Sequence, residues 1–311
     1  MTEVLTFGEA MASLRTPGPL RLGGAAQLSV AGSESNVAIG LARLGHDVAW
    51  AGVVGDDEPG ALVRRTLRAE GVGTRFVRTA AGAFTGFVAF DRPAYDITRV
   101  SYHRAGSAGS TLTADECVAA LTAAAPALLH LTGITPALSP TAREATLTAA
   151  RTARAAGVRV TFDVNHRARL WSRAQAEPVL RELIASVDTV FASEDELPLL
   201  SPSADPAADL LARGVAEVVV TAGAAGARCH TPDGTVSRPA LPVTVVDSVG
   251  AGDAFVSGYL SAVLDALPPQ DRLTRATASG AFCVGGRGDW ESLPTRDDLA
   301  LLARGPGHAA R

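Results

Sequence analysis

The stretch PVTVVDSVGAGDAFVSGYL, residues 242–260, joins a predicted strand to a predicted helix through a glycine-rich turn. We expect the strand over residues 242–247 and the helix from the end of the turn onward. Gly250, Ala251 and Gly252 carry little or no side chain, so an anion can approach their amide groups closely. Unpaired N–H groups and the helix dipole favour negative charge at such a helix start. The turn therefore predicts a cradle for a phosphoryl group.

Asp253 follows this cradle directly. A carboxylate beside the cradle repels a resting anion, but it fits a base that takes a proton from a hydroxyl about to attack phosphorus. The alternative is an aspartate that only caps the helix. This stretch alone leaves both interpretations open.

The same succession of strand and helix repeats along the chain. Most of the predicted strands are short, nearly continuous apolar runs, which is typical of a parallel sheet covered by helices on both faces. We therefore predict an α/β fold, a three-layer α/β/α body that forms a single domain over residues 1–311. Two segments, about 11–31 and 84–104, contain no helical pattern and partly alternate with period two. They predict a small β-sheet lid inserted into the body.

The chain of 311 residues contains no lysine, and all 28 of its basic residues are arginine. This excludes a Walker A phosphate loop, Schiff-base enzymes and a protein-kinase site, because each needs a lysine. If the protein handles phosphate, then arginines, backbone amides and a metal ion must supply the positive charge.

Other features limit the partners and the compartment. The formal net charge is -4 and no stretch is strongly basic, so we expect no nucleic-acid partner. No run approaches 18 apolar residues and the N-terminus has no secretory pattern, so we expect neither a membrane span nor export. Three scattered cysteines without a CxxC spacing argue against a zinc or disulfide framework and favour the cytoplasm.

Two motifs resemble the signatures of the ribokinase-like (PfkB-type) carbohydrate kinases. They are VAGSESNVAIGLARLG, residues 30–45, and DSVGAGDAFVSG, residues 247–258, roughly 200 residues further on. The resemblance covers essentially the whole chain and implies a ribokinase-like body with a mostly parallel sheet. It also implies transfer of the γ-phosphoryl of ATP to a hydroxymethyl group with Mg²⁺. Asp253 would then be the catalytic base, and the amides of Gly250, Ala251 and Gly252 would stabilise the transferring group.

Within this family, three stretches resemble the 2-keto-3-deoxygluconate kinases: YHRAGSAGS (102–110), LHLTGITPALS (129–139) and DVNHRARLW (163–171). A sugar acid carries a carboxylate, which a planar guanidinium can bind with two hydrogen bonds. Arg104 ends a predicted lid strand and Arg167 follows a body strand, so both can reach the cleft between them. The resemblance implies that these two arginines bind the carboxylate, and it adds further substrate contacts at Gly32, Asn36, Tyr102 and Asp289. Without the resemblance, surface arginines and a loop-capping aspartate would be the simpler interpretation.

The nucleotide and metal contacts rest on the same resemblance. It implies ATP contacts at Asn165, Ser193, Thr221, Gly223, Gly226, Gly252 and Thr277. Glu196 would organise Mg²⁺ through water, and a monovalent cation such as K⁺ would lie near Asp247 and the loop 283–288. The chain departs from the family pattern at three positions: Val88 stands where a tyrosine can occur, and Ser193 and Thr277 stand where many relatives carry asparagine.

The sequence thus leads to an ATP-dependent sugar-acid kinase, with 2-keto-3-deoxygluconate as the expected acceptor. A fructokinase or another ketose kinase of the same family is the alternative. A non-catalytic sugar or nucleotide sensor on the same fold is a third hypothesis, although such a sensor would not need Asp253. We also expect a homodimer formed through the lid, with apolar residues from 84–90, or a higher homo-oligomer.

Overall fold

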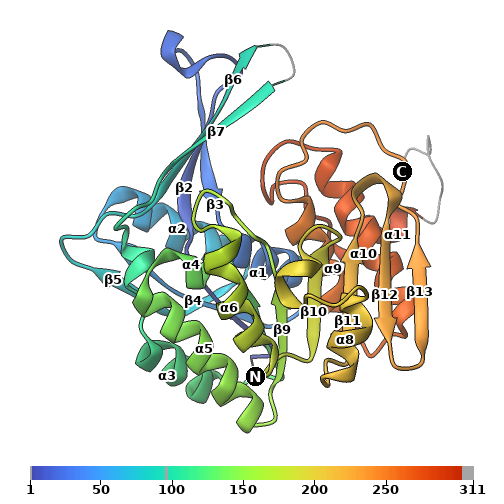
Figure 1. Ribbon diagram of the computed structural model, residues 1–311. Helices are drawn as coiled ribbons and strands as arrows, with labels where there is room; N and C mark the ends of the chain where they lie inside the picture. The colour runs from blue at the N-terminus through green and yellow to red at the C-terminus, as the bar shows by residue number, and fades with distance from the viewer. Residues whose placement is uncertain (1, 95–96, 303–311) are drawn as a thin grey trace.

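The computed structural model describes residues 2–94 and 97–302, which form a three-layer α/β/α body with a small projecting sheet (Figure 1). The central sheet has the strand order β13-β12-β11-β10-β9-β8-β1-β4-β5. Neighbouring strands from β5 to β11 run parallel, whereas β12 and β13 form an antiparallel edge. The predicted fold class is therefore confirmed. The strands of this sheet are β1 (Val4–Phe7), β4 (Val48–Gly55), β5 (Gly73–Ala80), β8 (Leu128–Thr132), β9 (Arg159–Asp163), β10 (Thr189–Ser193), β11 (Glu217–Thr221), β12 (Ala227–Thr231) and β13 (Gly234–Arg238).

Helices cover both faces because successive strand residues point to opposite sides of the sheet. In β1, Leu5 and Phe7 pack into one apolar core and Val4 packs into the other. The first core is completed by α3 (Ala114–Ala124), α5 (Pro140–Ala155), α6 (Arg173–Ile184), α7 (Leu197–Leu200) and α8 (Pro206–Ala212). The second is completed by α1 (Ser33–Arg43), α2 (Glu58–Ala69), α9 (Ala251–Leu264) and α10 (Pro269–Val284). The short helix α4 (Thr135–Leu138) packs Ala137 against the first core, and α11 (Arg296–Leu301) contributes no residue to either cluster.

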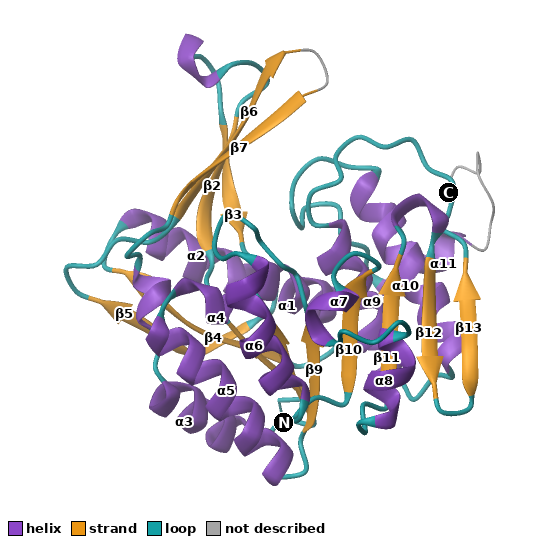
Figure 2. Cartoon of the chain, viewed as in Figure 1, coloured by secondary structure: helices purple, strands orange, loops and turns teal. Residues whose placement is uncertain are grey.

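The small sheet contains β2 (Met11–Arg15), β3 (Gln27–Ala31), β6 (Phe87–Ala94) and β7 (Ile97–His103), in the order β3-β2-β6-β7. The parallel pairing of β2 with β6 joins two distant chain segments. In Figure 2 the arrowheads of β10 and β11 point toward the side of the body from which this sheet projects. The sheet therefore stands over the carboxyl ends of the body strands, where open parallel sheets bind ligands.

The apolar segment 84–90, expected at a dimer through the lid, is buried in part within the chain, while Phe84 is 46% exposed. Met11, Ala31, Val88 and Phe90 pack together as a buried cluster of the small sheet. Val88 and Phe90 therefore already bury their side chains within one chain, and these two residues of the 84–90 segment are not available to a partner.

The strand predicted over residues 242–247 is absent, and this segment is an irregular loop. The central sheet ends at β13 and this segment pairs with no strand of it, and Pro242 has no N–H to donate. Val245 is 66% exposed. The amides of Val246 and Asp247 instead donate to the carbonyl of Val284, at 2.8 and 3.3 Å. The loop still delivers the chain to the start of α9, as the sequence predicted.

Two further expectations concern the membrane and the cysteines. In the described part of the chain, no helix is both long and apolar enough to cross a bilayer. Cys117, Cys229 and Cys283 are all buried and free.

Candidate functional site

A cavity of about 470 Å³ lies between the small sheet and the carboxyl ends of the body strands. Its wall brings together predicted site residues from the whole length of the chain. Those that line it are Gly32, Asn36, Tyr102, Arg104, Asn165, Arg167, Ser193, Glu196, Thr221, Gly250, Gly252, Asp253 and Asp289. Val88 and Tyr102 stand opposite one another on β6 and β7 and both face this cavity.

Four of the predicted residues, Ala251, Gly223, Gly226 and Thr277, do not line this cavity. Gly226 has a positive φ of 99°, and a Cβ there would lie 2.1 Å from the carbonyl oxygen of Arg238. The turn after β11 thus requires glycine for a structural reason. The Thr277 hydroxyl donates within its own helix, to the carbonyls of Leu273 and Thr274 at 2.9 and 3.1 Å. The ATP contacts of Gly223, Gly226 and Thr277 remain predictions.

The glycine-rich turn forms the open start of α9. Gly250 adopts φ 80°, and a Cβ at this position would lie 2.0 Å from the carbonyl oxygen of Asp289. A Cβ on Gly252 would meet nothing within 4 Å, so the approach to this residue is open. Within the described residues, the amides of Gly250, Gly252 and Asp253 donate no hydrogen bond. These free donors at a helix start suit an anionic group.

Asp253 is buried beside this cradle and is held by two donors from α1. The Ser33 hydroxyl donates to Oδ1 at 2.6 Å, and the Asn36 amide donates to Oδ2 at 2.7 Å. Burial raises the pKa of Asp253, whereas these hydrogen bonds and the charge of Arg167 act in the opposite direction. A carboxylate with a raised pKa is a stronger base, and each oxygen has a further lone pair for a substrate hydroxyl. Sequence reasoning did not identify Ser33.

Asn165 connects Asp253 to a second buried acid, Asp163. Its side-chain amide donates to the Ser33 hydroxyl at 3.0 Å and to Asp163 Oδ2 at 3.1 Å. The pKa of Asp163 lies well above its usual range because of burial, and the negative charges of Glu196 and Asp253 add to the shift. Sequence reasoning did not select Asp163, although its place at the carboxyl end of β9 was a usable signal.

Glu196 and Ser193 form one unit at the end of β10. The Glu196 carboxylate accepts hydrogen bonds from the amide of His166 at 2.7 Å and from the amide and hydroxyl of Ser193 at 2.9 and 2.8 Å. Within residues 2–94 and 97–302, no group of three or more His, Cys, Asp or Glu side chains is arranged to hold a metal ion. Mg²⁺ needs no such cage, since it is commonly held by one or two carboxylates, waters and phosphates.

The two predicted carboxylate-binding arginines differ. Arg104 Nε donates to Glu9 Oε2 at 2.6 Å and its Nη2 forms an ion pair with the same oxygen. Glu9 is buried and also accepts a hydrogen bond from the Ser107 hydroxyl. Arg167, in contrast, is exposed on the cavity wall, and its side chain has no hydrogen bond or ion pair with the described residues. Glu9 has no local sequence signal, because its partners lie in another segment.

Asp247, predicted near a monovalent cation, accepts a hydrogen bond from Arg15 at 2.6 Å. Arg15 also forms an ion pair with Asp289. Burial raises the pKa of Asp289 to about 6, although Arg15 opposes the shift. The Arg15 guanidinium therefore bridges these two acids.

Comparison with known proteins places this geometry in a family. Residues 1–296 match the family described as pfkB family carbohydrate kinase. The chain belongs to this family. The resemblance seen in the two signatures is thus confirmed, and the protein is a carbohydrate kinase. The third hypothesis, a non-catalytic sensor, is not retained.

Individual relatives extend over nearly the whole chain. The chain is 36% identical to a 2-dehydro-3-deoxygluconokinase from Bacillus subtilis (strain 168), with 96% of this chain and 94% of the relative covered. It is 32% identical to a fructokinase from Klebsiella pneumoniae, with 96% and 98% covered. The crystal structure of a PfkB protein from Polaromonas sp. JS666 superposes with a TM-score of 0.87 at 36% identity, covering 96% of this chain and 99% of that one.

Proposed function

We propose that this pfkB family kinase is an ATP-dependent sugar-acid kinase. Its acceptor is 2-keto-3-deoxygluconate (2-dehydro-3-deoxygluconate) and its product is 2-keto-3-deoxy-6-phosphogluconate. The observation that carries the proposal is the unpaired Arg167 guanidinium on the cavity wall. A free guanidinium in a cavity rich in carboxylates is a binding site for an acidic ligand. The similarity to a 2-dehydro-3-deoxygluconokinase supports the same acceptor.

In this proposal, Asp253 takes the proton from the terminal hydroxymethyl group of the sugar acid. The substrate oxygen then forms a bond to the γ-phosphorus while the bond from that phosphorus to the bridging oxygen of ATP breaks, and ADP leaves. The amides at the start of α9 donate to the transferring group, where negative charge accumulates. Ser33 and Asn36 keep the base aimed at the cavity. Closure of the small sheet as a lid excludes water, the competing acceptor.

The carboxylates at the cavity fit a magnesium ion. Asp163 and Glu196 provide oxygen ligands. Burial raises the pKa of Asp163, and the negative charges of Glu196 and Asp253 raise it further, so a nearby cation would favour its ionised form. When bound, Mg²⁺ would neutralise charge on the triphosphate. Asp163 and Glu196 would hold it, directly or through water, and Asn165 would keep the Asp163 carboxylate in place.

A ketose kinase is the second candidate, and one observation favours it. The charge of Arg104 is already balanced by Glu9, so only one of the two arginines expected to bind a substrate carboxylate, Arg167, is left for that role. A neutral ketose needs neither of them. The similarity to a fructokinase points the same way. Val88 also removes a hydroxyl that some sugar-acid kinases offer, and one hydrogen bond can change selectivity strongly.

A panel of acceptors separates the two candidates. ADP formation is measured with ATP and Mg²⁺ for 2-keto-3-deoxygluconate, its C4 epimer 2-keto-3-deoxygalactonate, and fructose. We expect kcat/KM for the sugar acids to exceed that for fructose by at least about tenfold, the effect of one well-placed ionic contact. Equal or better use of fructose would replace the sugar acid by the ketose.

We propose a homodimer formed through the small sheet, on residues other than those first expected. Leu22, Leu28 and Ile97 are 75%, 59% and 61% exposed on this sheet and its connection. Large apolar side chains on the exterior of a small sheet favour an interaction surface there. Light scattering of Leu28→Glu/Ile97→Glu against the unchanged protein tests the dimer. A monomer in the unchanged protein would contradict it.

We also propose that the protein works in the cytoplasm. All three of its cysteines are buried free thiols, which fits a reducing compartment. Fractionation of cells that produce the protein tests this location.

A further inference from the structure

Arg15, the last residue of β2, connects the small sheet to the body. Its Nη1 donates to Asp247 Oδ2 at 2.6 Å and its Nη2 forms an ion pair with Asp289 Oδ1. These partners are 232 and 274 residues away along the chain. The guanidinium also lies 4.0 Å from the centre of the Phe90 ring, its neighbour in the small sheet. Arg15 is only 14% exposed, so these charges attract one another with little screening by water.

Both of its carboxylate partners border the anion cradle. The carbonyl of Asp289 packs so closely on Gly250 that a single added methyl would lie 2.0 Å from its oxygen. Asp247 Oδ1 accepts a hydrogen bond from the amide of Val249 at 3.1 Å, one residue before the cradle. A shift of either aspartate would therefore move the backbone that presents the amides of the cradle.

Other contacts bring the same part of the body to the small sheet. The Ser29 hydroxyl donates to Glu291 Oε1 at 2.6 Å, and the Trp290 indole donates to the carbonyl of Val30 at 2.9 Å. The segment 289–291 is thus attached to both β2 and β3. Arg15 differs from these contacts because it also reaches Asp247, on the other side of the cradle.

Phe90, whose ring lies under the Arg15 guanidinium, lines two cavities. The larger is the candidate active site, and a second cavity of about 330 Å³, lined by Arg15, Phe90, Asp247 and Arg287, lies next to it. Removal of the guanidinium would leave Asp247 and Asp289 without the cation that they share. This change acts on the cradle rather than on the core of the small sheet, whose apolar cluster does not include Arg15.

We propose that Arg15 is a positioning residue that couples closure of the small sheet to the geometry of the anion cradle, acting through Asp247 and Asp289. This inference rests on the proposed kinase function. When the small sheet is closed, Arg15 holds the loops on both sides of Gly250 at a fixed separation. When the sheet opens, the two acids lose their shared cation and the loops separate.

The test compares three variants with the best acceptor found in the panel. Arg15→Met keeps an unbranched stem for packing on Phe90 but removes the charge. Arg15→Lys keeps the charge but cannot bridge two carboxylates with a planar fork. Arg99→Met is the matched control, because Arg99 pairs with Asp91 within the small sheet and does not reach the body.

We expect Arg15→Met to lower kcat about 10- to 100-fold, as for a misplaced catalytic group, with a smaller rise in the KM for sugar. Arg15→Lys should recover part of this loss, and Arg99→Met should match the unchanged enzyme. In an Asp247→Asn background the loss from Arg15→Met should shrink, because the repulsion between the two acids is already relieved. If Arg15→Met lowers the melting temperature but leaves kcat within twofold, the role is only structural and the proposal is wrong. An unchanged enzyme that phosphorylates no sugar would instead overturn the proposed function.

Discussion

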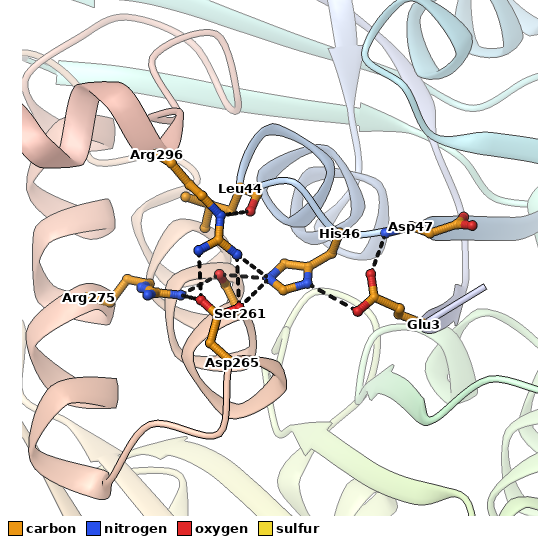
Figure 3. A network of polar contacts seen from close by, with 8 residues as sticks. All are labelled: Glu3, Leu44, His46, Asp47, Ser261, Asp265, Arg275 and Arg296. Carbon is orange, nitrogen blue, oxygen red and sulfur yellow. Dashed lines mark hydrogen bonds and ion pairs between the residues drawn. The ribbon is translucent and has the colours of Figure 1, made fainter. Parts of the chain in front are cut away.

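The carboxyl ends and the amino ends of the parallel strands form two edges of the central sheet, and each carries a cluster of charged side chains. The two clusters are built in opposite ways. At the carboxyl edge, Asp163, Glu196 and Asp253 line the cavity with Arg167 as a nearby cation, and burial raises the pKa of Asp163 and Asp253. At the amino edge, a network around His46 and Asp265 pairs the Asp265 carboxylate with two arginines (Figure 3).

The side chains of the network at the amino edge are joined by short hydrogen bonds. Asp265 accepts hydrogen bonds from Arg275 at 2.6 Å and from Arg296 at 2.8 and 2.9 Å, and these guanidinium groups lower its pKa far below the usual range. His46 Nε2 lies 3.0 Å from the Ser261 hydroxyl, and burial lowers the pKa of His46, which favours its neutral form. These contacts join the turn before β4 to α9, α10 and α11.

This difference separates acids that stabilise the fold from acids that are available for catalysis. An acid whose pKa is lowered on folding stabilises the folded state, whereas an acid whose pKa is raised lowers stability and becomes available for chemistry. The first edge faces a cavity and the start of α9, whose first amides are free within the described residues. Variants at the two edges should therefore separate activity from stability.

The largest effect is expected for Asp253→Asn. An amide cannot accept the substrate proton, so kcat should fall about 10²- to 10⁴-fold. The melting temperature should not fall, since a buried charge with a raised pKa is removed. Steady-state assays and thermal unfolding measure the two quantities. Turnover within tenfold of the unchanged enzyme would show that Asp253 is not the base.

Asp265→Asn should have the opposite effect, a loss of stability without a loss of activity. It leaves Arg275 and Arg296 without their shared carboxylate, and we expect the free energy of unfolding to drop by about 1–2 kcal/mol. Values of kcat and KM should not change. Urea unfolding measures the loss, with Asp209→Asn as the control, because Asp209 forms only an exposed pair with Arg213. A loss of activity without a loss of stability would remove the contrast between the two edges.

Arg167→Met tests the cation of the first edge. We expect the KM for 2-keto-3-deoxygluconate to rise about 10- to 100-fold, because the variant loses a charge-assisted contact. The KM for fructose, which has no carboxylate, should change by less than about threefold on the same reasoning. Arg173→Met is the control, since Arg173 contacts the carbonyl of Asp195 outside the cavity. Equal changes for both sugars would mean that Arg167 does not bind the carboxylate.

The smallest effect is expected for Ser33→Ala. The Ser33 hydroxyl stabilises ionised Asp253, so its loss raises the pKa of that carboxyl further. Because the base must be ionised, the acidic limb of the profile of kcat/KM against pH should move to higher pH by about 0.5–1 unit. His46→Asn, at the other edge, should leave this limb in place. A shift to lower pH with Ser33→Ala would contradict the role of Asp253.

The sequence predicted those parts of the site that are local. Gly250 and Asp253 belong to one turn, so their roles follow from three or four neighbouring residues. Glu9, Arg15 and Ser33 were missed because their partners lie far away along the chain, at Arg104, Asp289 and Asp253. No local pattern reports a contact of that kind.

The strands of the fold also divide into those that local sequence predicts and those that it does not. Buried strands such as β8 and β11 were predictable because their apolar runs are continuous. The edge strand β5 has a mixed, half-exposed pattern and did not stand out. Residues 242–247 have strand propensity but no neighbouring strand. Propensity is local, whereas a free sheet edge is a property of the whole molecule.

The hydrogen bond between Ser33 and Asp253 also has a consequence for synthesis. Its two ends are separated by 220 residues, and the neighbouring bond from Asn36 spans 217. During translation, α1 is therefore synthesised long before α9, and the base can meet its two donors only when most of the chain has been made. Contacts of such long range form late. A prematurely terminated product that ends before α9 has neither the cradle nor the base, so it cannot consume ATP by this route.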